Sequence, residues 1–122
     1  MLIVEDYLDT QELYRELLSQ AGFRVAGASS GEEAIAKAAE LCPDAILMDL
    51  SLPGIDGWEA TRRIRQDPRL QKTAIVALTG YTSSRFSESA RKAGCDAFLI
   101  KPCQPTTIIA EVRRLIEEKR KS

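Results

Sequence analysis

The sequence predicts an α/β fold in which helices cover both faces of a parallel β-sheet. Short apolar runs alternate five times with segments whose apolar residues recur at helical intervals. The central runs are continuously apolar, which is typical of strands buried on both faces. The chain has 122 residues, of which 44% are hydrophobic and 29% charged, so we expect one globular domain over residues 1–122. Five strand–helix units in one domain indicate a doubly wound three-layer sandwich.

The first strand–helix unit begins directly after Met1. Residues 2–4 form an apolar run and predict a short strand. Residues 9–12 read Asp-Thr-Gln-Glu, a capping-box spacing that predicts the start of a helix. The apolar residues at helical intervals, expected to face the core, are Leu13, Leu17 and Ala21. Gly22 suits the end of this helix.

The second unit repeats this pattern. Residues 23–28 predict a strand, and Ser30 is expected to cap the following helix, with Glu33 three positions later. The apolar residues of this helix are Ala34, Ala38 and Leu41. Pro43 marks its end, because proline cannot continue a helix.

Three further strands are expected over residues 45–48, 74–78 and 97–100. The helix after the first of these carries Trp58, Thr61 and Ile64 on one side and ends near Pro68. The next helix is expected over 84–93 and closes at Gly94. The last helix starts near Pro105, and the residues expected to face the core are Ile108, Ile109, Val112, Leu115 and Ile116.

The composition excludes several classes of function. The sequence has no histidine, which rules out Ser-His-Asp and Cys-His nucleophile pairs and histidine-containing zinc sites. A formal net charge of −1 offers no general attraction to nucleic acid or to an anionic membrane. No apolar run reaches about 18 residues and no leader peptide is recognisable, so we expect a soluble cytoplasmic protein. Cys42, Cys95 and Cys103 form no CxxC pair and are expected to be reduced thiols with packing roles.

Polar residues stand at the ends of the predicted strands. Glu5 and Asp6 follow the first strand, Asp49 the third, Thr79 the fourth and Lys101 the fifth. Any one of these residues could simply cap a helix or lie in a solvated loop. In an open α/β sheet, however, the ligand crevice lies beyond the carboxyl ends of the strands, so these five side chains are expected to converge.

The three carboxylates suggest a cation site. Clustered carboxylates repel one another and raise one another's pKa unless a cation lies among them. Mg²⁺ (or Mn²⁺) takes oxygen ligands and commonly binds a phosphate oxygen as well. Lys101 and the hydroxyl of Thr79 can contact further oxygens of the same phosphate. An ionised Asp49 is then a competent nucleophile toward phosphorus, and the product is an aspartyl phosphate.

Four blocks of sequence, in order, resemble the receiver domain of two-component response regulators. They are Val-Glu-Asp at 4–6, Pro-Asp-Ala-Ile-Leu-Met-Asp-Leu-Ser-Leu-Pro-Gly-Ile-Asp-Gly at 43–57, Ala-Leu-Thr-Gly at 77–80 and Ala-Phe-Leu-Ile-Lys-Pro at 97–102. The resemblance spans nearly the whole chain. It implies a flavodoxin-like fold with strand order 2-1-3-4-5. It fits either a stand-alone receiver or a piece of a longer protein.

The resemblance also assigns roles around the acidic cluster. It implies that Asp49 is the phosphoacceptor, that Asp6 binds Mg²⁺ directly and that Glu5 acts through water. The third protein ligand would be the backbone carbonyl of Ser51.

A second set of roles concerns switching. Thr79 and Phe98 match the family's switch pair, and Lys101 would contact the phosphoryl group and precede a cis peptide bond to Pro102. The expected donor is a histidine kinase or a histidine phosphotransfer protein. An output domain or a downstream protein would read the surface formed by the fourth helix, the fifth strand and the fifth helix.

Two alternative functions remain open at this point. The chain could be a pseudo-receiver that binds proteins without being phosphorylated. It could also be an Asp-nucleophile phosphatase of the haloacid-dehalogenase type, but that family expects an acid two residues after the nucleophile, where this chain has Ser51. We therefore expect a signalling domain and not an enzyme, one that catalyses only its own phosphorylation and dephosphorylation.

Overall fold

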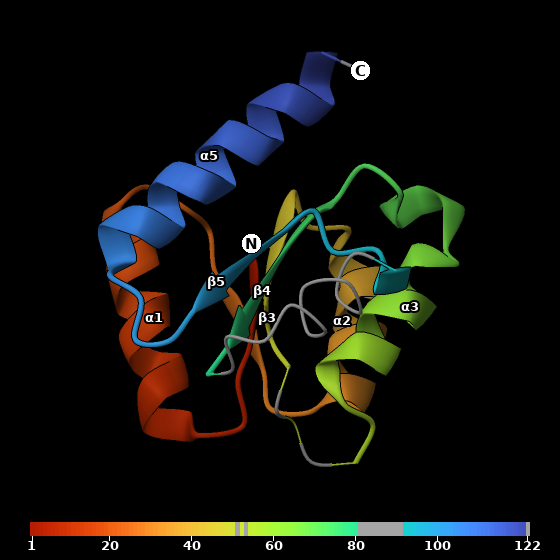
Figure 1. The fold of residues 1–122 in the computed structure, drawn as a ribbon, viewed down its shortest axis with the longest axis horizontal. Coiled ribbons are helices and arrows are strands. Elements are labelled where there is room, and N and C mark those ends of the chain that lie inside the picture. Colours follow the sequence, from red (N-terminus) through yellow and green to blue (C-terminus); the bar gives the residue numbers. More distant parts are fainter. Residues whose placement is uncertain (51, 53, 81–91, 122) are drawn as a thin grey trace.

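The computed structural model describes residues 1–50, 52, 54–80 and 92–121. Its strands form one five-stranded parallel sheet in the order β2-β1-β3-β4-β5, so the expected order is confirmed. The strands are β1 (Leu2–Val4), β2 (Ala26–Ala28), β3 (Ala45–Asp49), β4 (Ala74–Thr79) and β5 (Ala97–Ile100). All carboxyl ends therefore lie at one edge of the sheet, the lower edge in Figure 1.

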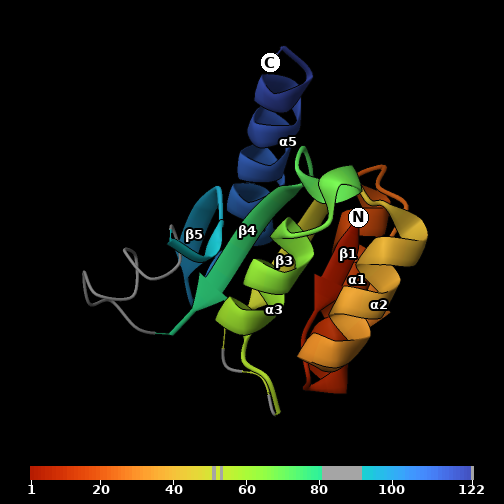
Figure 2. The ribbon, with the colours of Figure 1, turned by 90° about the vertical axis from the view of Figure 1, so that its right-hand side faces the viewer.

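Helices cover both faces of this sheet, as Figures 1 and 2 show. The helices α1 (Leu8–Gln20) and α5 (Pro105–Lys121) lie on one face. The helices α2 (Gly31–Leu41) and α3 (Gly57–Arg65) lie on the other, and a 3-10 turn, η1 (Pro68–Leu70), follows α3. Within the described residues, none of the helices combines the length and apolar character that crossing a lipid bilayer requires.

The apolar strands supply two hydrophobic clusters, one on each side of the sheet. In β3, Ile46 and Met48 pack on the α2–α3 side, whereas Ala45 and Leu47 pack on the α1–α5 side. Successive side chains of a strand point to opposite faces, so a strand covered on both faces must be apolar throughout. This is the physical reason for the continuous apolar run in the sequence.

Helix α1 differs from its prediction in both its start and its buried side. It begins at Leu8, and its N-cap residue Tyr7 makes no side-chain capping bond, so the capping box expected over 9–12 is wrong. Its buried residues are Gln11 and Leu18, while Leu13 is 54% exposed. Leu13 lies roughly 200° around the helix from Gln11, so the two residues cannot both face the sheet.

The second unit agrees with its prediction except at its ends. Ser30 caps α2 by accepting a hydrogen bond from the backbone N–H of Glu33 at 3.1 Å. Leu41, expected in the core, is 48% exposed at the end of the helix. Cys42 follows in the left-handed conformation with φ 45° and is exposed, so its expected packing role is wrong. The strand expected over 23–28 shortens to β2, because this edge strand pairs only with the three residues of β1.

The helix expected over 84–93 lies mainly outside the described residues. Helix α5 begins at Pro105 as expected, and Ile108, Val112 and Leu115 are its buried residues. Ile109 and Ile116 are only partly buried, against the same cluster.

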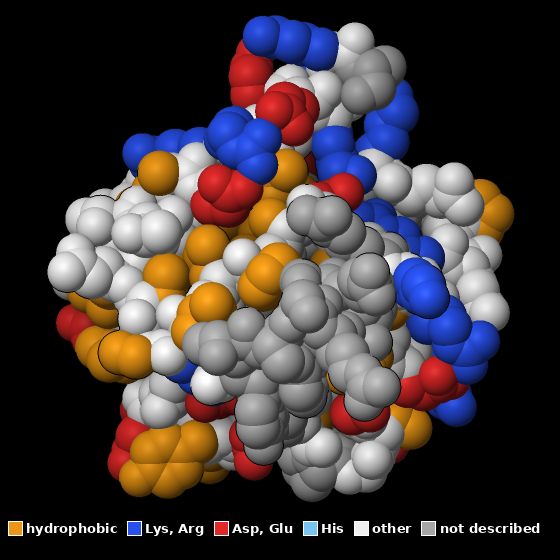
Figure 3. Space-filling view, viewed as in Figure 1, with side chains coloured by type: hydrophobic (Ala, Val, Ile, Leu, Met, Phe, Trp, Pro, Cys, Tyr) orange, Lys and Arg blue, Asp and Glu red, His pale blue; other side chains and the backbone are white. Residues whose placement is uncertain are grey.

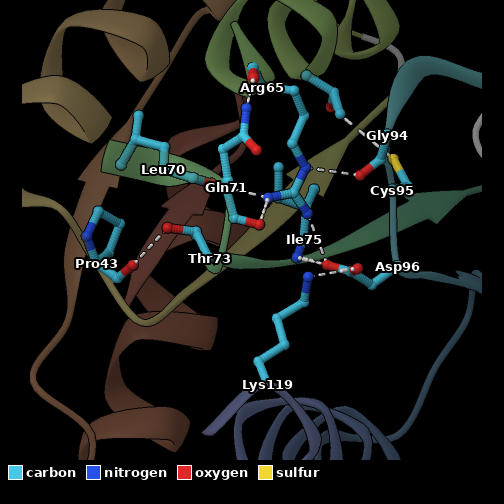
Figure 4. A network of polar contacts seen from close by, with 11 residues as sticks. Pro43, Arg65, Leu70, Gln71, Thr73, Ile75, Gly94, Cys95, Asp96 and Lys119 are labelled. Carbon is cyan, nitrogen blue, oxygen red and sulfur yellow. Dashed lines mark hydrogen bonds and ion pairs between the residues drawn. The ribbon is translucent and has the colours of Figure 1, made fainter. Parts of the chain in front are cut away.

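A network of polar contacts joins elements at the edge of the sheet opposite the carboxyl ends, and it is drawn in Figure 4. Asp96 accepts hydrogen bonds from the guanidinium of Arg65 at 2.7 Å and from the backbone N–H of Ile75 at 2.8 Å. Its second carboxylate oxygen lies 2.9 Å from Nζ of Lys119. Arg65 also donates to the carbonyl of Gly94 at 2.9 Å. One carboxylate thus connects α3, β4, β5 and α5, and we call this set of contacts the Asp96 network.

Candidate functional site

The polar residues predicted to converge do meet at the carboxyl edge of the sheet. Carboxylate oxygens of Glu5, Asp6 and Asp49 lie within 4.8 Å of one another. Nζ of Lys101 lies 3.1 Å from Oδ2 of Asp49 and 4.0 Å from Oε2 of Glu5. The structure therefore brings four of the predicted site residues into one cluster, which we call the acidic site.

Asp49 is placed by the end of β3 and by the start of α3. Asp49 pairs with Leu78 in the sheet register, and the N–H of Leu50 donates to the carbonyl of Leu78 at 3.0 Å. Gly57 lets α3 approach closely, because a Cβ at this position would lie 2.4 Å from the carbonyl oxygen of Asp49. The side chain of Asp49 is only 6% exposed. The carboxylate of Asp49 thus sits in a shielded and tightly packed position.

Glu5 and Asp6 occupy the turn between β1 and α1. The N–H of Glu5 donates to the carbonyl of Ala28 at 3.0 Å, which extends the pairing of β1 with β2 by one residue. Glu5 is 6% exposed, whereas Asp6 is exposed. One carboxylate of the pair is therefore enclosed by the fold, and the other faces solvent at the mouth of the site.

Lys101 reaches the acidic site from the end of β5. Its backbone N–H donates to the carbonyl of Thr79 at 2.7 Å, and its peptide bond to Pro102 is cis, as the resemblance implied. Its side chain is 32% exposed. Burial lowers the pKa of Lys101, but the hydrogen bond and the charge of Asp49, together with the charge of Glu5, outweigh it and raise the pKa above its ordinary value. Lys101 is therefore a cation in this site.

The side chain of Glu5 has a strongly raised pKa. Burial, a hydrogen bond with Asp49 and the negative charge of Asp49 raise the pKa of Glu5 to about 8, against the opposing charge of Lys101. Burial is the largest cause of this shift, and the crowding of carboxylates that the sequence predicted adds to it. A single lysine does not offset it.

The residues present fit a divalent cation. Oε2 of Glu5 is buried, and among the described residues it has no hydrogen-bond partner. A buried polar atom that makes no hydrogen bond costs free energy that a bound ion would recover. The donors are all carboxylate oxygens, which suit Mg²⁺ and Mn²⁺. The acidic site could therefore hold such an ion.

Thr79 and Phe98 lie on the same face of the sheet. Phe98 pairs with Ala77 in the register of β4 and β5, and both pack on the α2–α3 side. Thr79 stands two residues beyond Ala77, so strand alternation places it on this face too. Thr79 is 1% exposed, and Phe98 is partly buried. The two are diagonal neighbours on adjacent strands.

One predicted residue, Ser51, is not described by the structure, and one residue near the site, Gln11, was not predicted. Ser51, whose carbonyl was expected as a ligand, lies outside the described residues. Gln11, which sequence reasoning missed as a site residue, is buried in α1, and its side-chain amide donates to the carbonyl of Glu5 at 2.9 Å. The sequence offered no signal for this residue, because hydrophobic periodicity along α1 favours Leu13 on the buried side.

The fold and the acidic site together define a class of protein, namely the small doubly wound domains that gather charged side chains at the carboxyl edge of a parallel sheet. Within that class, the chain belongs to the response regulator receiver domain family, whose family model matches residues 1–113. It is therefore a signalling domain of two-component systems and not a classical enzyme.

Individual relatives agree with this assignment. The polar-differentiation response regulator DivK of Brucella ovis is 33% identical over 113 residues, which cover 93% of this chain and 92% of the relative. The chemotaxis protein CheY4 of Vibrio cholerae has a similar structure, with a TM-score of 0.89 and 30% identity over 93% of this chain and 95% of that chain. The receiver domain of the sensor histidine kinase PA1611 of Pseudomonas aeruginosa PAO1 has a TM-score of 0.87 and 34% identity, with coverage of 95% of both chains. Its structure has a magnesium ion coordinated in the active site cleft.

Proposed function

We propose that residues 1–122 form one receiver domain that accepts a phosphoryl group on Asp49, with Mg²⁺ bound at the acidic site. The observation that carries this proposal is the pairing of a buried carboxylate with a lysine, since Nζ of Lys101 lies 3.1 Å from Asp49. The donor is the phosphohistidine of a histidine kinase or of a phosphotransfer protein. Residues 1–122 contain no histidine, so the phosphohistidine lies outside this domain.

The transfer is a displacement at phosphorus. A carboxylate oxygen of Asp49 forms a bond to phosphorus while the phosphorus–nitrogen bond of the donor breaks. The leaving imidazole nitrogen keeps the electron pair and takes up a proton. Lys101 and the hydroxyl of Thr79 stabilise oxygens of the transferring group by charge and by hydrogen bonding.

The cation would be held by carboxylates of this chain. Asp6 and Asp49 would be the direct ligands, Glu5 would act through water, and the backbone carbonyl of Ser51, which lies outside the described residues, would be the remaining protein ligand. A divalent cation supplies positive charge to the phosphoryl oxygens and offsets the repulsion between the incoming phosphate and the carboxylates.

The placement of Thr79 and Phe98 on one face of adjacent strands supports a switch between two conformations. When the hydroxyl of Thr79 turns toward the phosphoryl group, it vacates space on the face that Phe98 also occupies, and the ring turns inward. The surface that changes includes β5 and α5, together with the expected fourth helix. Ile100 of β5 is 42% exposed, and Figure 3 shows hydrophobic side chains over β5 on this face. An output domain or a downstream protein would bind there.

Contact with the donor protein is supported by exposed apolar side chains beside the acidic site. Tyr7 is 62% exposed and Leu8 61% exposed, immediately after Asp6. Leu13, 54% exposed, lies further along α1. Apolar side chains of this size that remain in solvent are typical of a protein-binding surface.

Intact-mass spectrometry after incubation with acetyl phosphate and Mg²⁺ tests the proposal. We expect the mass of one phosphoryl group to be added to the wild type and nothing to be added to Asp49→Asn or to a sample with EDTA. Asp56→Asn is the matched control, because Asp56 caps α3 and asparagine caps a helix equally well. An adduct that persists in Asp49→Asn contradicts the proposal. Absence of an adduct in the wild type favours the pseudo-receiver function.

A further inference from the structure

The side chain of Gln11 is a polar group in the interior of the protein. It is 5% exposed and shares the buried side of α1 with Leu18. Burying an amide is unfavourable unless its hydrogen-bonding atoms find partners. A glutamine at such a position therefore requires a specific set of contacts.

Those contacts are the backbone carbonyls at the ends of two strands. Nε2 of Gln11 donates to the carbonyl of Glu5 at 2.9 Å and to that of Ala28 at 3.0 Å. The carbonyl of Ala28 also accepts the N–H of Glu5 at 3.0 Å. The amide group thus uses both of its hydrogens to join the end of β1 to the end of β2.

Gly27 makes room for this amide. A Cβ at Gly27 would lie 2.1 Å from Oε1 of Gln11 and 2.8 Å from its Cδ. The amide therefore fills a space that exists only because residue 27 has no side chain. Gln11 and Gly27 are a matched pair.

The carbonyl of Glu5 belongs to the peptide bond between Glu5 and Asp6. This bond is planar, and its plane contains the Cα atoms of both residues. A hydrogen bond that holds the carbonyl oxygen therefore restrains the orientation of this plane, and with it the directions in which the two side chains leave the backbone. We propose that Gln11 is a positioning residue that sets the direction of the Glu5 and Asp6 carboxylates toward a bound divalent cation. This inference rests on the proposed cation site. It adds a residue of α1 that does not bind the cation but holds the backbone of two residues that would. Groups that orient metal ligands by hydrogen bonding typically change metal affinity by about 10 to 100-fold when they are removed.

The test compares Mg²⁺ affinity with fold stability in the full chain. Gln11→Met keeps the length of the side chain and removes its donors. Leu18→Ala is the matched control, because Leu18 is 1% exposed on the same side of α1 and belongs to the hydrophobic cluster there. Isothermal titration calorimetry with MgCl₂ measures affinity, and urea unfolding in EDTA measures stability.

We expect Gln11→Met to bind Mg²⁺ about 10-fold more weakly than the wild type. Leu18→Ala is expected to lose stability while its Mg²⁺ affinity stays within about 2-fold of the wild type, because it leaves the carbonyl contacts intact. Gly27→Ala should also weaken Mg²⁺ binding, because its methyl group displaces the amide of Gln11. If Gln11→Met folds poorly, the Mg²⁺ affinity of Gly27→Ala tests the inference in its place.

Three results would overturn the inference. Wild-type affinity in both Gln11→Met and Gly27→Ala would show that the amide does not orient the carboxylates. An equal loss of affinity in Leu18→Ala would show only a general effect of stability. If the wild type itself binds no Mg²⁺, the proposed cation site fails and the inference fails with it, whereas the first two results leave the proposed function standing.

Discussion

Nζ of Lys101 lies 3.1 Å from Oδ2 of Asp49, although 52 positions separate the two residues in the chain. They meet because β4 lies between β3 and β5, and all three strands end at the same edge of the sheet. The side chains are 32% and 6% exposed, respectively. A charge removed from water is costly without a partner, so each residue stabilises the other in this position.

Replacing Lys101 with methionine should slow phosphorylation of Asp49 on the order of 100-fold, the cost typical of losing one group that stabilises a transition state. The reason is that Lys101 supplies positive charge to the transferring phosphoryl group, while Asp49 and the other carboxylates remain. The rate of mass gain with acetyl phosphate and Mg²⁺ measures the effect. Lys121→Met, which changes an exposed lysine near the C-terminus, should keep the wild-type rate. Equal rates for the two variants would remove Lys101 from the proposed mechanism.

Without metal, the free energy of unfolding should fall as the pH rises from about 4.5 to about 8. Burial and the neighbouring Asp49 raise the pKa of Glu5 from 4.5 to about 8 in the folded protein. The folded state therefore holds this proton more tightly than the unfolded state. The resulting stabilisation is complete below the ordinary pKa and is lost as the pH passes through the folded one.

Urea unfolding in EDTA at a series of pH values checks this expectation. Glu5→Gln removes the titrating group and should flatten the dependence over this range. Glu16→Gln, a change at an exposed position of α1, should preserve the dependence. A wild-type curve that rises with pH over the same interval, with no change in Glu5→Gln, would contradict the assignment.

Gly57→Ala should destabilise the protein by about 1 to 3 kcal/mol, the range for an added methyl group in a packed site. The new Cβ would lie 2.4 Å from the carbonyl oxygen of Asp49 and 2.8 Å from Cα of Leu50, and neither backbone atom moves easily. Gly80→Ala is the matched control, because no atom of the described residues lies within 4 Å of a Cβ at that position. Chemical denaturation of both variants measures the difference, and equal stability would show that α3 does not pack against β3 as described.

Asp96→Ala should destabilise the fold by about 2 to 4 kcal/mol, because it leaves the charge of Arg65 and the N–H of Ile75 without their partner. The side chains of Arg65 and Asp96 are only 17% and 19% exposed, so water replaces the lost contacts poorly. A double-mutant cycle with Lys119→Met separates the contribution of α5 from that of α3. A coupling energy of zero between Asp96 and Lys119 would show that their 2.9 Å contact does not hold α5.

The features that could be predicted from the sequence depend mainly on residues that are close together in the chain. The five apolar runs, the serine cap of α2 and the polar residues at the ends of four strands were all visible in the sequence. Convergence of Glu5, Asp6, Asp49 and Lys101 followed, because parallel strands end at one edge. The strand order came from the resemblance to receiver domains, since periodicity does not specify which strands are neighbours.

The sequence by itself therefore determined the class of fold, the charged residues at the carboxyl edge and the described helices and strands apart from some of their ends. Only the tertiary structure decided which side of α1 is buried, because hydrophobic periodicity favours Leu13 and does not register that the amide of Gln11 finds carbonyl partners on β1 and β2. The same holds for the Asp96 network and for the raised pKa of Glu5. Each depends on groups that the chain brings together from distant positions, and the energies of hydrogen bonds and charges depend on those distances and on burial.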